Sequence, residues 1–362
     1  MVPPFPVTYT TLSAAALMAW LEGVYELGVV AACCLLHRGL NDSFLVEAAR
    51  GRYVLRIYRA GWRTADEIAY EMAVLGHLGK KGVGVALPVP RRDGALVEWL
   101  AAPEGGRAAV LFTHAPGREL DGSHRDSRRY GRAVASVHAA TDDFETVHPR
   151  FALDLEHLLS EPLAAIRPLL RHRPADLDFI ETLAASVRRR VAALPTDAMD
   201  RGFCHGDFHG DNAHIDGESV TLFDFDCGGP GWRAYDIAVF RWRWGDDEAG
   251  EARWAAFLEG YRSLRPIGEA DLAAVPLFVA ARAIWLRGLH AANTADWGRS
   301  WLNDGYWDRL LKGLREWQTK HREGNGAESA STAAFADSPG GTPVVPAETI
   351  VADAPATQRP KL

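Results

Sequence analysis

The hydrophobic pattern divides the chain into a strand-rich first third and a helical remainder. Near the start, apolar residues at helical spacing predict a helix over residues 13–26. Short apolar or alternating segments then predict strands at residues 32–36, 44–47 and 52–58. In the third strand, Arg56 is expected on the face opposite its two apolar neighbours, because side chains alternate along a strand.

A helix and two further strands complete this first unit. Thr64, followed three residues later by Glu67, forms a capping box and predicts the start of a helix. Strand-like patterns at residues 95–100 and 108–114 follow a Gly- and Pro-rich connection. Strands with one main helix indicate a small α+β unit with an antiparallel sheet, which we place at residues 1–114.

Beyond residue 114 the pattern is mostly helical. A strand is expected only at residues 220–225, between helical segments that extend to about residue 320. We therefore predict a larger, mostly helical second unit at residues 115–322. From residue 323 to 362 the periodicity vanishes and Gly, Ala, Ser, Thr and Pro dominate, so we expect this tail to be disordered.

Charge and hydropathy narrow the classes of partner. The net charge of −7 and the pI near 6.0 argue against bulk affinity for nucleic acid or an anionic membrane. The sequence shows no uninterrupted apolar run of the roughly 18 residues that span a bilayer. The first 20 residues contain no Lys or Arg, unlike a signal peptide. We expect a cytoplasmic protein without a nucleic-acid or membrane partner.

One polar motif carries most of the chemical information. Asp207 and Asn212 lie five residues apart, and Asp224 lies at the end of a predicted strand. Turn and cap residues are the alternative explanation for such side chains. The combined pattern is nevertheless that of phosphoryl transfer, in which one carboxylate accepts the hydroxyl proton while an amide and a second carboxylate hold Mg²⁺. We therefore predict Asp207 as general base and Asn212 and Asp224 as metal ligands.

These residues resemble the aminoglycoside phosphotransferase/choline kinase superfamily, which has a bilobal protein-kinase-like fold. His205-Gly206-Asp207 with Asn212 resembles the catalytic loop of that family, and Asp224 resembles its metal-binding Asp. Residues 232–238 resemble a further family segment, which contains Asp236. The resemblance implies ATP and Mg²⁺ as cofactors. It also implies that His205 and Asp236 support the catalytic loop without touching substrate.

The first unit then fits a nucleotide-binding lobe. Phosphoryl transfer needs a permanent cation on a central strand, fixed by a carboxylate on the next helix, and Arg56 with Glu71 fits this description. A solvent-facing strand arginine is the alternative. The loop at residues 39–43 resembles the phosphate-covering hairpin, with Ser43 as a donor, or is a plain turn. Thr113 and Ala115 fall at the expected hinge, whose unpaired backbone groups would hold adenine.

The residues that would bind the acceptor are left open by the pattern. An acidic cluster, Asp246, Asp247, Glu248 and Glu251, fits either a rim for a cationic acceptor or a solvated helix N-terminus, and we favour the second. On a later apolar helix, Arg282, Arg287 and His290 fit an anionic or protein acceptor, or the surface. His209 and His214 flank Asn212 and are expected to be loop hydrogen-bonders.

Three functions remain compatible with this pattern. The first is an ATP- and Mg²⁺-dependent O-phosphotransferase acting on a hydroxyl of a small molecule. The second is a Ser/Thr protein kinase, because residues 39–47, residues 53–59 and the segment Asp224-Phe225-Asp226 look closest to bacterial stress-response kinases. The third is a nucleotide-binding pseudokinase scaffold, which Arg in place of the usual Lys weakly favours. The complete set of base and metal ligands argues for an active enzyme.

Overall fold

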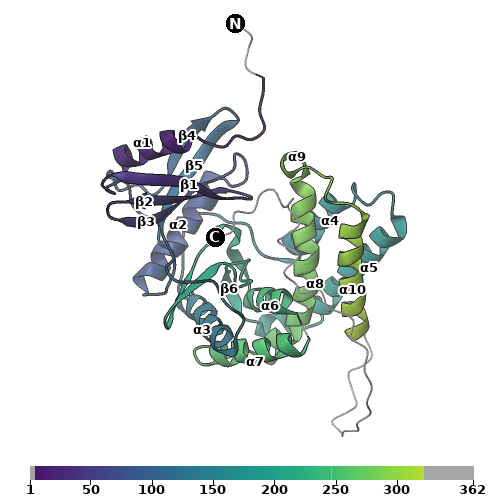
Figure 1. The fold of residues 1–362 in the computed structure, drawn as a ribbon. Helices are drawn as coiled ribbons and strands as arrows, with labels where there is room; N and C mark the ends of the chain where they lie inside the picture. The colour runs from purple at the N-terminus through teal and green to yellow at the C-terminus, as the bar shows by residue number, and fades with distance from the viewer. Residues whose placement is uncertain (1–4, 246, 322–362) are drawn as a thin grey trace, which may run out of the picture.

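The computed structural model describes residues 5–245 and 247–321. The predicted disordered tail and Asp246 lie outside these residues. The N-terminal lobe is built on a five-stranded antiparallel sheet of order β1-β2-β3-β5-β4 (Figure 1). Its strands are β1 (Val30–Arg38), β2 (Asp42–Ala48), β3 (Gly51–Ile57), β4 (Glu98–Ala102) and β5 (Gly105–Thr113).

Two helices cover this sheet, and each belongs to a different hydrophobic core. Helix α1 (Ala14–Val24) packs with Leu55 and Ile57 in a core that lies within the N-terminal lobe. Helix α2 (Ala65–Lys80) packs with Tyr58 and Val110 in a second core that continues into the other lobe. The alternation predicted for β3 is confirmed, because Arg56 and Glu71 meet on the α2 side of the sheet.

The start of α2 is fixed locally, as the sequence predicted. The Thr64 side chain accepts a hydrogen bond from the Glu67 backbone N–H at 3.2 Å, and the Glu67 carboxylate accepts one from the Thr64 N–H at 2.8 Å. The two bonds form a complete capping box. The box orients the helix that carries Glu71 toward the central strand of the sheet.

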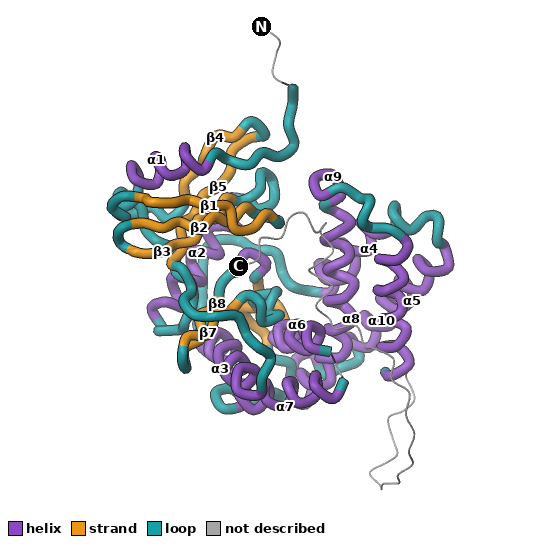
Figure 2. Tube along the Cα trace, in the orientation of Figure 1, coloured by secondary structure: helices purple, strands orange, loops and turns teal. Residues whose placement is uncertain are grey.

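The second lobe is mostly helical, as predicted (Figure 2). Its helices are α3 (His124–Ala140), η1 (Glu156–Ser160), α4 (Glu161–Ile166), α5 (Pro174–Ala192), η2 (Thr196–Ala198), η3 (Phe225–Cys227), α6 (Arg233–Trp244), α7 (Glu248–Arg262), α8 (Glu269–Ala292), α9 (Thr294–Trp297) and α10 (Asp304–Lys320). Two small sheets lie among them, β6 (Arg201–Cys204) with β9 (Gly229–Trp232) and β7 (Ala213–Asp216) with β8 (Ser219–Leu222).

The strand predicted at residues 220–225 is wrong at its C-terminal end. Strand β8 stops at Leu222, and residues 225–227 form the short helix η3. The physical reason is Asp224, whose backbone is left-handed with φ 68° and ψ 58°. It is the one non-glycine residue with positive φ within residues 5–245 and 247–321. An extended strand cannot continue through that conformation, which costs an L-residue about 1–2 kcal/mol.

Helix α8 revises the prediction about membranes. By length and composition alone, this helix is apolar enough to cross a bilayer, which the search for uninterrupted apolar runs did not detect. However, 61% of its most apolar window is buried inside the fold. Core helices of soluble proteins share this property.

Two segments, the α2–β4 connection of the N-terminal lobe and the hinge after β5, dock on the β7–β8 hairpin. In the first, the Ala86 N–H donates to the Leu222 carbonyl at 2.8 Å. In the second, Arg118 and Ile215 exchange two backbone hydrogen bonds of 3.0 and 2.7 Å. The approach is so close that a Cβ on Gly117, where φ is +93°, would lie 2.1 Å from the Ile215 oxygen. The hinge therefore rests directly on the hairpin that follows Asn212.

Candidate active site

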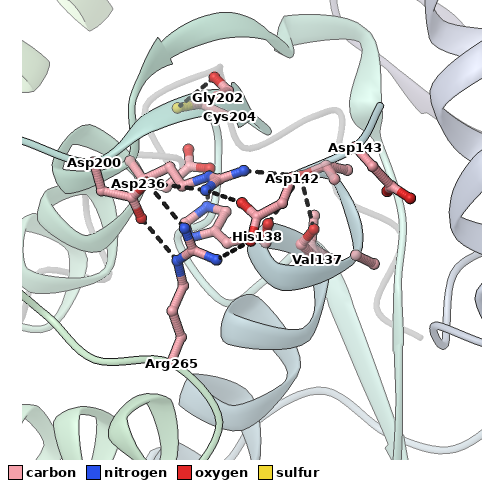
Figure 3. A network of polar contacts seen from close by, with 12 residues as sticks. Val137, His138, Asp142, Asp143, Asp200, Gly202, Cys204, Asp236 and Arg265 are labelled. Atoms are coloured by element: carbon pink, nitrogen blue, oxygen red, sulfur yellow. Dashed lines mark hydrogen bonds and ion pairs between the residues drawn. The ribbon is translucent and has the colours of Figure 1, made fainter. Parts of the chain in front are cut away.

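The loop that carries Asp207 joins β6 to β7 and is held from below by Asp236 near the start of α6. The Asp236 carboxylate accepts the backbone N–H of His205 at 2.7 Å and that of Gly206 at 2.8 Å. Its Oδ2 also lies 3.0 Å from Nε2 of His138 on α3, and both side chains are fully buried (Figure 3). Three contacts on one carboxylate thus fix the position of the loop.

An ion-pair cluster surrounds this carboxylate and was not anticipated from the sequence. Arg265 donates to Asp200 at 2.7 Å and to Asp142 at 2.6 Å (Figure 3). Arg233, the first residue of α6, contacts the same two carboxylates at 3.0 and 2.6 Å and is 1% exposed. The cluster fastens the beginning of α6, and with it Asp236, to the end of α3.

The His205 side chain links the loop to the segment before Asp224. Its Nε2 lies 3.0 Å from the Phe223 carbonyl, and its Nδ1 accepts the Asp207 N–H at 3.2 Å. Burial lowers the pKa of His205, with Asp236 and Asp207 opposing, so the ring is neutral. A neutral ring that donates from Nε2 and accepts at Nδ1 satisfies both bonds.

The Asp207 carboxylate faces three partners, and its side chain is partly exposed. Oδ2 lies 3.1 Å from Nδ2 of Asn212 and 3.2 Å from Nε2 of His209, and Oδ1 accepts from Arg282 of α8. Burial would raise the pKa of Asp207, but His209 and Arg282 lower it below its ordinary value. The carboxylate is therefore ionised, and its side chain is 20% exposed.

Two of these partners were not assigned to Asp207 from the sequence. His209, expected to be a loop hydrogen-bonder, contacts both Asp207 and Asp211, which raise its pKa to about 9 against the opposing effect of burial. Arg282, for which a surface position was an alternative, is 2% exposed. The helical spacing of apolar residues around Arg282 was the available signal, because a charged residue inside a buried stripe needs a partner.

Asn212 directly precedes the β7–β8 hairpin in the sequence, and Asp224 follows it. Nδ2 of Asn212 donates to the Asp207 carbonyl at 3.1 Å, and the Asn212 carbonyl accepts the Phe223 N–H at 3.0 Å. The hairpin thereby brings Asn212 beside the residue that precedes Asp224. Burial, Asp226 and Asp207 raise the pKa of Asp224 to about 7, whereas Arg56 lowers it.

The predicted cation and its carboxylate lie together in the N-terminal lobe. Arg56 donates to Glu71 at 2.8 Å, and the Tyr58 hydroxyl donates to the other Glu71 oxygen at 2.7 Å. A second Arg56 nitrogen reaches Oδ1 of Asp224 at 2.8 Å, a contact that the sequence did not suggest. Burial opposes the charged form, but Asp224 and Glu71 raise the pKa of Arg56, so it is a permanent cation.

The position of Ser43 differs from the prediction. Residues 39–41 form the turn, whereas Ser43 lies inside β2, opposite His37 on one side and Arg56 on the other. It lies in the strand because the ladder between β1 and β2 starts directly at Asp42. The turn residue that reaches the other lobe is Asn41, whose Nδ2 donates to Asp226 at 2.6 Å.

At the predicted hinge, Thr113 and Ala115, two backbone groups are already paired within the chain. The Thr113 N–H donates to the Leu87 carbonyl at 2.9 Å, because the chain before β4 pairs along β5. The Ala115 carbonyl accepts from Nδ1 of His214 at 2.8 Å. Within the described ranges, the Ala115 N–H has no hydrogen-bond partner.

The acidic cluster after α6 is a helix cap rather than a rim of the cleft. The Asp247 side chain accepts the Gly250 N–H at 2.8 Å at the start of α7. Glu251 pairs with Arg241, while Glu248 is exposed in the first turn of the helix. Asp246 lies outside the described residues. The preferred interpretation, a solvated helix N-terminus, is supported by these contacts.

Comparison with known proteins identifies the family. The model of the phosphotransferase enzyme family (APH) matches residues 35–267. An uncharacterized protein of Deinococcus radiodurans is 44% identical over 322 residues, covering 88% of this chain and 93% of that protein. A homoserine kinase of Sinorhizobium fredii is 29% identical over 289 residues, covering 76% of this chain and 83% of that protein.

Solved structures agree on the fold. An amicoumacin kinase, hAmiN, in complex with AMP-PNP, Ca²⁺ and Ami, superposes with a TM-score of 0.69 at 20% identity, covering 84% of this chain and 94% of that one. A microcompartment-associated aminopropanol kinase superposes with a TM-score of 0.67 at 24% identity, covering 84% of this chain and 95% of that one. The fold predicted from the sequence is confirmed, and no finding separates the stress-response branch from the others. The family match includes both the Arg56 strand and the Asp207 loop, so the chain belongs to the phosphotransferase enzyme family and is a kinase.

Proposed function

We propose that this kinase transfers the γ-phosphoryl group of Mg²⁺-bound ATP to a hydroxyl of a small molecule, with Asp207 as the general base. The observation that carries the proposal is the convergence of Asp207, Asn212 and Asp224 beneath Arg56. Asp207 contacts Asn212 at 3.1 Å, and Asp224 contacts Arg56 at 2.8 Å. These elements are the ones that phosphoryl transfer requires.

In this proposal Asp207 accepts the proton of the acceptor hydroxyl. The hydroxyl oxygen bonds to the γ-phosphorus, the bond from that phosphorus to the bridging oxygen breaks, and ADP leaves. Arg282 and His209 keep the pKa of Asp207 low, so the base is ionised before the acceptor arrives. His205 and Asp236 act through the backbone, since they hold the loop at 2.7–3.2 Å and do not face the cleft.

The nucleotide would lie between β3 and the hinge. Arg56, fixed by Glu71, would contact the α- and β-phosphates, with Ser43 on the same sheet face as Arg56. The unpartnered Ala115 N–H beside Thr113 would donate to adenine. Solved structures of relatives contain AMP-PNP or ADP, which supports a nucleotide at the equivalent place here.

The donor set fits Mg²⁺. Asp224 offers a carboxylate that is 43% exposed, and Asn212 offers an amide oxygen without a hydrogen-bond partner in the described residues. Hard oxygen ligands completed by water and phosphate are what Mg²⁺ prefers. When bound, the ion would neutralise charge on the phosphates. Left-handed Asp224 supports this role, since strained backbone concentrates at functional sites.

For the acceptor, the names of the relatives favour small hydroxyl compounds, since homoserine, aminopropanol and amicoumacin kinases are among them. A protein Ser/Thr acceptor of the stress-response type is the second candidate. It rests on the sequence pattern alone, in residues 39–47, residues 53–59 and the segment 224–226.

The test is ATP turnover by the purified chain with Mg²⁺ against homoserine, aminopropanol, choline, an aminoglycoside and a generic protein substrate. We expect ADP release with a small hydroxyl compound and none with Asp207→Asn. Asp224→Asn should weaken ATP binding in the presence of Mg²⁺ but not without it, measured by titration. Transfer to the protein substrate alone would favour the second candidate, and turnover retained by Asp207→Asn would refute the base assignment.

A further inference from the structure

Helix α8 carries two buried arginines, and only one of them has a counter-ion. Arg282 is 2% exposed and pairs with Asp207. Arg287, five residues later, is 6% exposed and has no carboxylate within ion-pair distance in the part of the chain that the structure describes. Its Nε and Nη1 are enclosed and lack any hydrogen-bond partner. Its nearest aromatic contact is the Tyr306 ring, whose centroid lies 5.8 Å from Cζ.

An unpaired buried guanidinium is costly, and elsewhere this fold avoids it. Arg107 is fully buried, but it bonds to Asp42 at 3.0 Å and to the carbonyls of Tyr58, Ile57 and Thr10. Arg56 and Arg233 are likewise held by two carboxylates each. A structural role would not explain Arg287, because an unpaired buried charge costs free energy that an apolar side chain of similar size would not.

The surroundings of Arg287 are positive and aromatic. Repulsion from Arg282 adds to burial in lowering the pKa of Arg287, and both arginines add to burial in lowering that of His290. His290 bonds to the Tyr306 hydroxyl at 2.6 Å and is flanked by the rings of Trp297 and Trp301. The three basic groups in the C-terminal half of α8 therefore share one neighbourhood, which Arg282 links to Asp207.

We propose that Arg287 binds the carboxylate of the acceptor, so that the acceptor is a small hydroxy acid whose hydroxyl reaches Asp207. This proposal rests on the proposed function. Five residues of α-helix rise about 7.5 Å, which suits a compact molecule with the hydroxyl near Arg282 and the anion near Arg287. A guanidinium recognises a planar carboxylate by paired N–H donors.

The test compares two acceptors that differ only in charge, homoserine and its carboxamide, with the full chain, ATP and Mg²⁺. We expect the wild type to prefer homoserine by at least tenfold in kcat/KM. Arg287→Met should raise the KM for homoserine at least tenfold and leave that for the carboxamide nearly unchanged. Arg287→Lys should recover part of the preference, whereas Arg262→Met, an exposed control on α7, should keep all of it.

Thermal unfolding separates this inference from the proposed function. We expect 4-hydroxybutyrate to raise the Tm of the wild type and 4-hydroxybutyramide to leave it unchanged. Neither compound should raise the Tm of Arg287→Met. Without ligand, the Tm of Arg287→Met should be equal to or above that of the wild type. This result would support the carboxylate site even if no acceptor were phosphorylated, an outcome that would refute the proposed function. The inference would be overturned if the wild type used homoserine and the carboxamide equally well, or if Arg287→Met kept the preference for homoserine. Either result would still be compatible with the proposed function, namely phosphoryl transfer to a neutral acceptor.

Discussion

Arg56 and Arg287 are both buried arginines, one on strand β3 of the N-terminal lobe and one on helix α8 of the second lobe. Arg56 is neutralised within the chain by Glu71 and Asp224, each at 2.8 Å. Arg287 has no acidic partner in the described residues. Because burying an unpaired charge is costly, Arg56 is balanced within the chain, whereas in our proposal Arg287 is balanced only when the acceptor carboxylate binds. We call the two surroundings the nucleotide side and the acceptor side, after the roles proposed for them.

The two sides meet at Asp207, where we expect the largest effect. Asp207→Asn should lower kcat by roughly 10²–10⁴-fold, because general-base catalysis contributes that much. The affinity for ATP should stay unchanged, measured by titration calorimetry. Asp216→Asn, an exposed position on the neighbouring hairpin, is the matched control and should retain full activity.

On the nucleotide side, Glu71→Gln should be strongly destabilising. The substitution leaves Arg56 with only the half-exposed Asp224, and breaking a buried pair costs about 3–5 kcal/mol. Urea denaturation measures this loss. Arg287→Met, measured in the same way, should lose nothing, and comparable losses in the two variants would remove the distinction between the sides.

The hinge offers a sharper test of the nucleotide side. Gly117 and Gly94 have similar φ of +93° and +86°, but only a Cβ on Gly117 would clash with a backbone oxygen. Gly117→Ala should therefore cost about 1–3 kcal/mol more than Gly94→Ala, as overpacking does. Equal losses of unfolding free energy in the two variants would show that the hinge can move away from the β7–β8 hairpin.

On the acceptor side, His290 should make stability depend on pH. Burial, Arg287 and Arg282 lower its pKa to about 3, from 6.5 in the unfolded chain. Below pH 6.5 His290 is protonated in the unfolded chain but stays neutral in the native protein. Its contribution to the free energy of unfolding is therefore complete above pH 6.5 and is lost as the pH falls toward 3. At pH 5 the loss is about 2 kcal/mol.

His290→Gln should flatten this dependence between pH 7 and pH 5, measured by urea denaturation at both values. The exposed His172 serves as a control, and His172→Gln should leave the dependence as it is in the wild type. If His290→Gln keeps the wild-type slope, the positive neighbourhood on α8 does not act on His290.

The sequence was most informative on the nucleotide side. There the roles are tied to fixed spacings, such as Asp207 with Asn212, and to strand alternation, which placed Arg56 opposite Glu71. The contact between Arg56 and Asp224 could not be read from spacing, because it joins residues 168 positions apart. The left-handed backbone of Asp224 could not be predicted either, because an apolar strand pattern does not indicate at which residue φ becomes positive.

The acceptor side could not be predicted because its side chains act across helices. Arg282 reaches Asp207 from a helix 75 residues later, and nothing in the local pattern of α8 says which face meets the loop. The local pattern alone does not separate Asp236 from a helix cap either, and its role as a support of the loop was expected only from the family resemblance. Helical periodicity identifies a buried face but not what that face is packed against.

The docking of the α2–β4 connection and of the hinge on the β7–β8 hairpin has a consequence for motion between the two lobes. On the hinge side the lobes are joined by backbone hydrogen bonds and by glycines that admit no side chain. On the far side they are joined by side chains, namely Asn41 with Asp226 and Arg59 with Asp296. If nucleotide enters between the lobes, we expect the lobes to pivot on this hairpin and the far contacts to separate. Since charged contacts weaken in salt and backbone ones do not, ionic strength should speed the exchange of nucleotide while leaving the axis of motion in place.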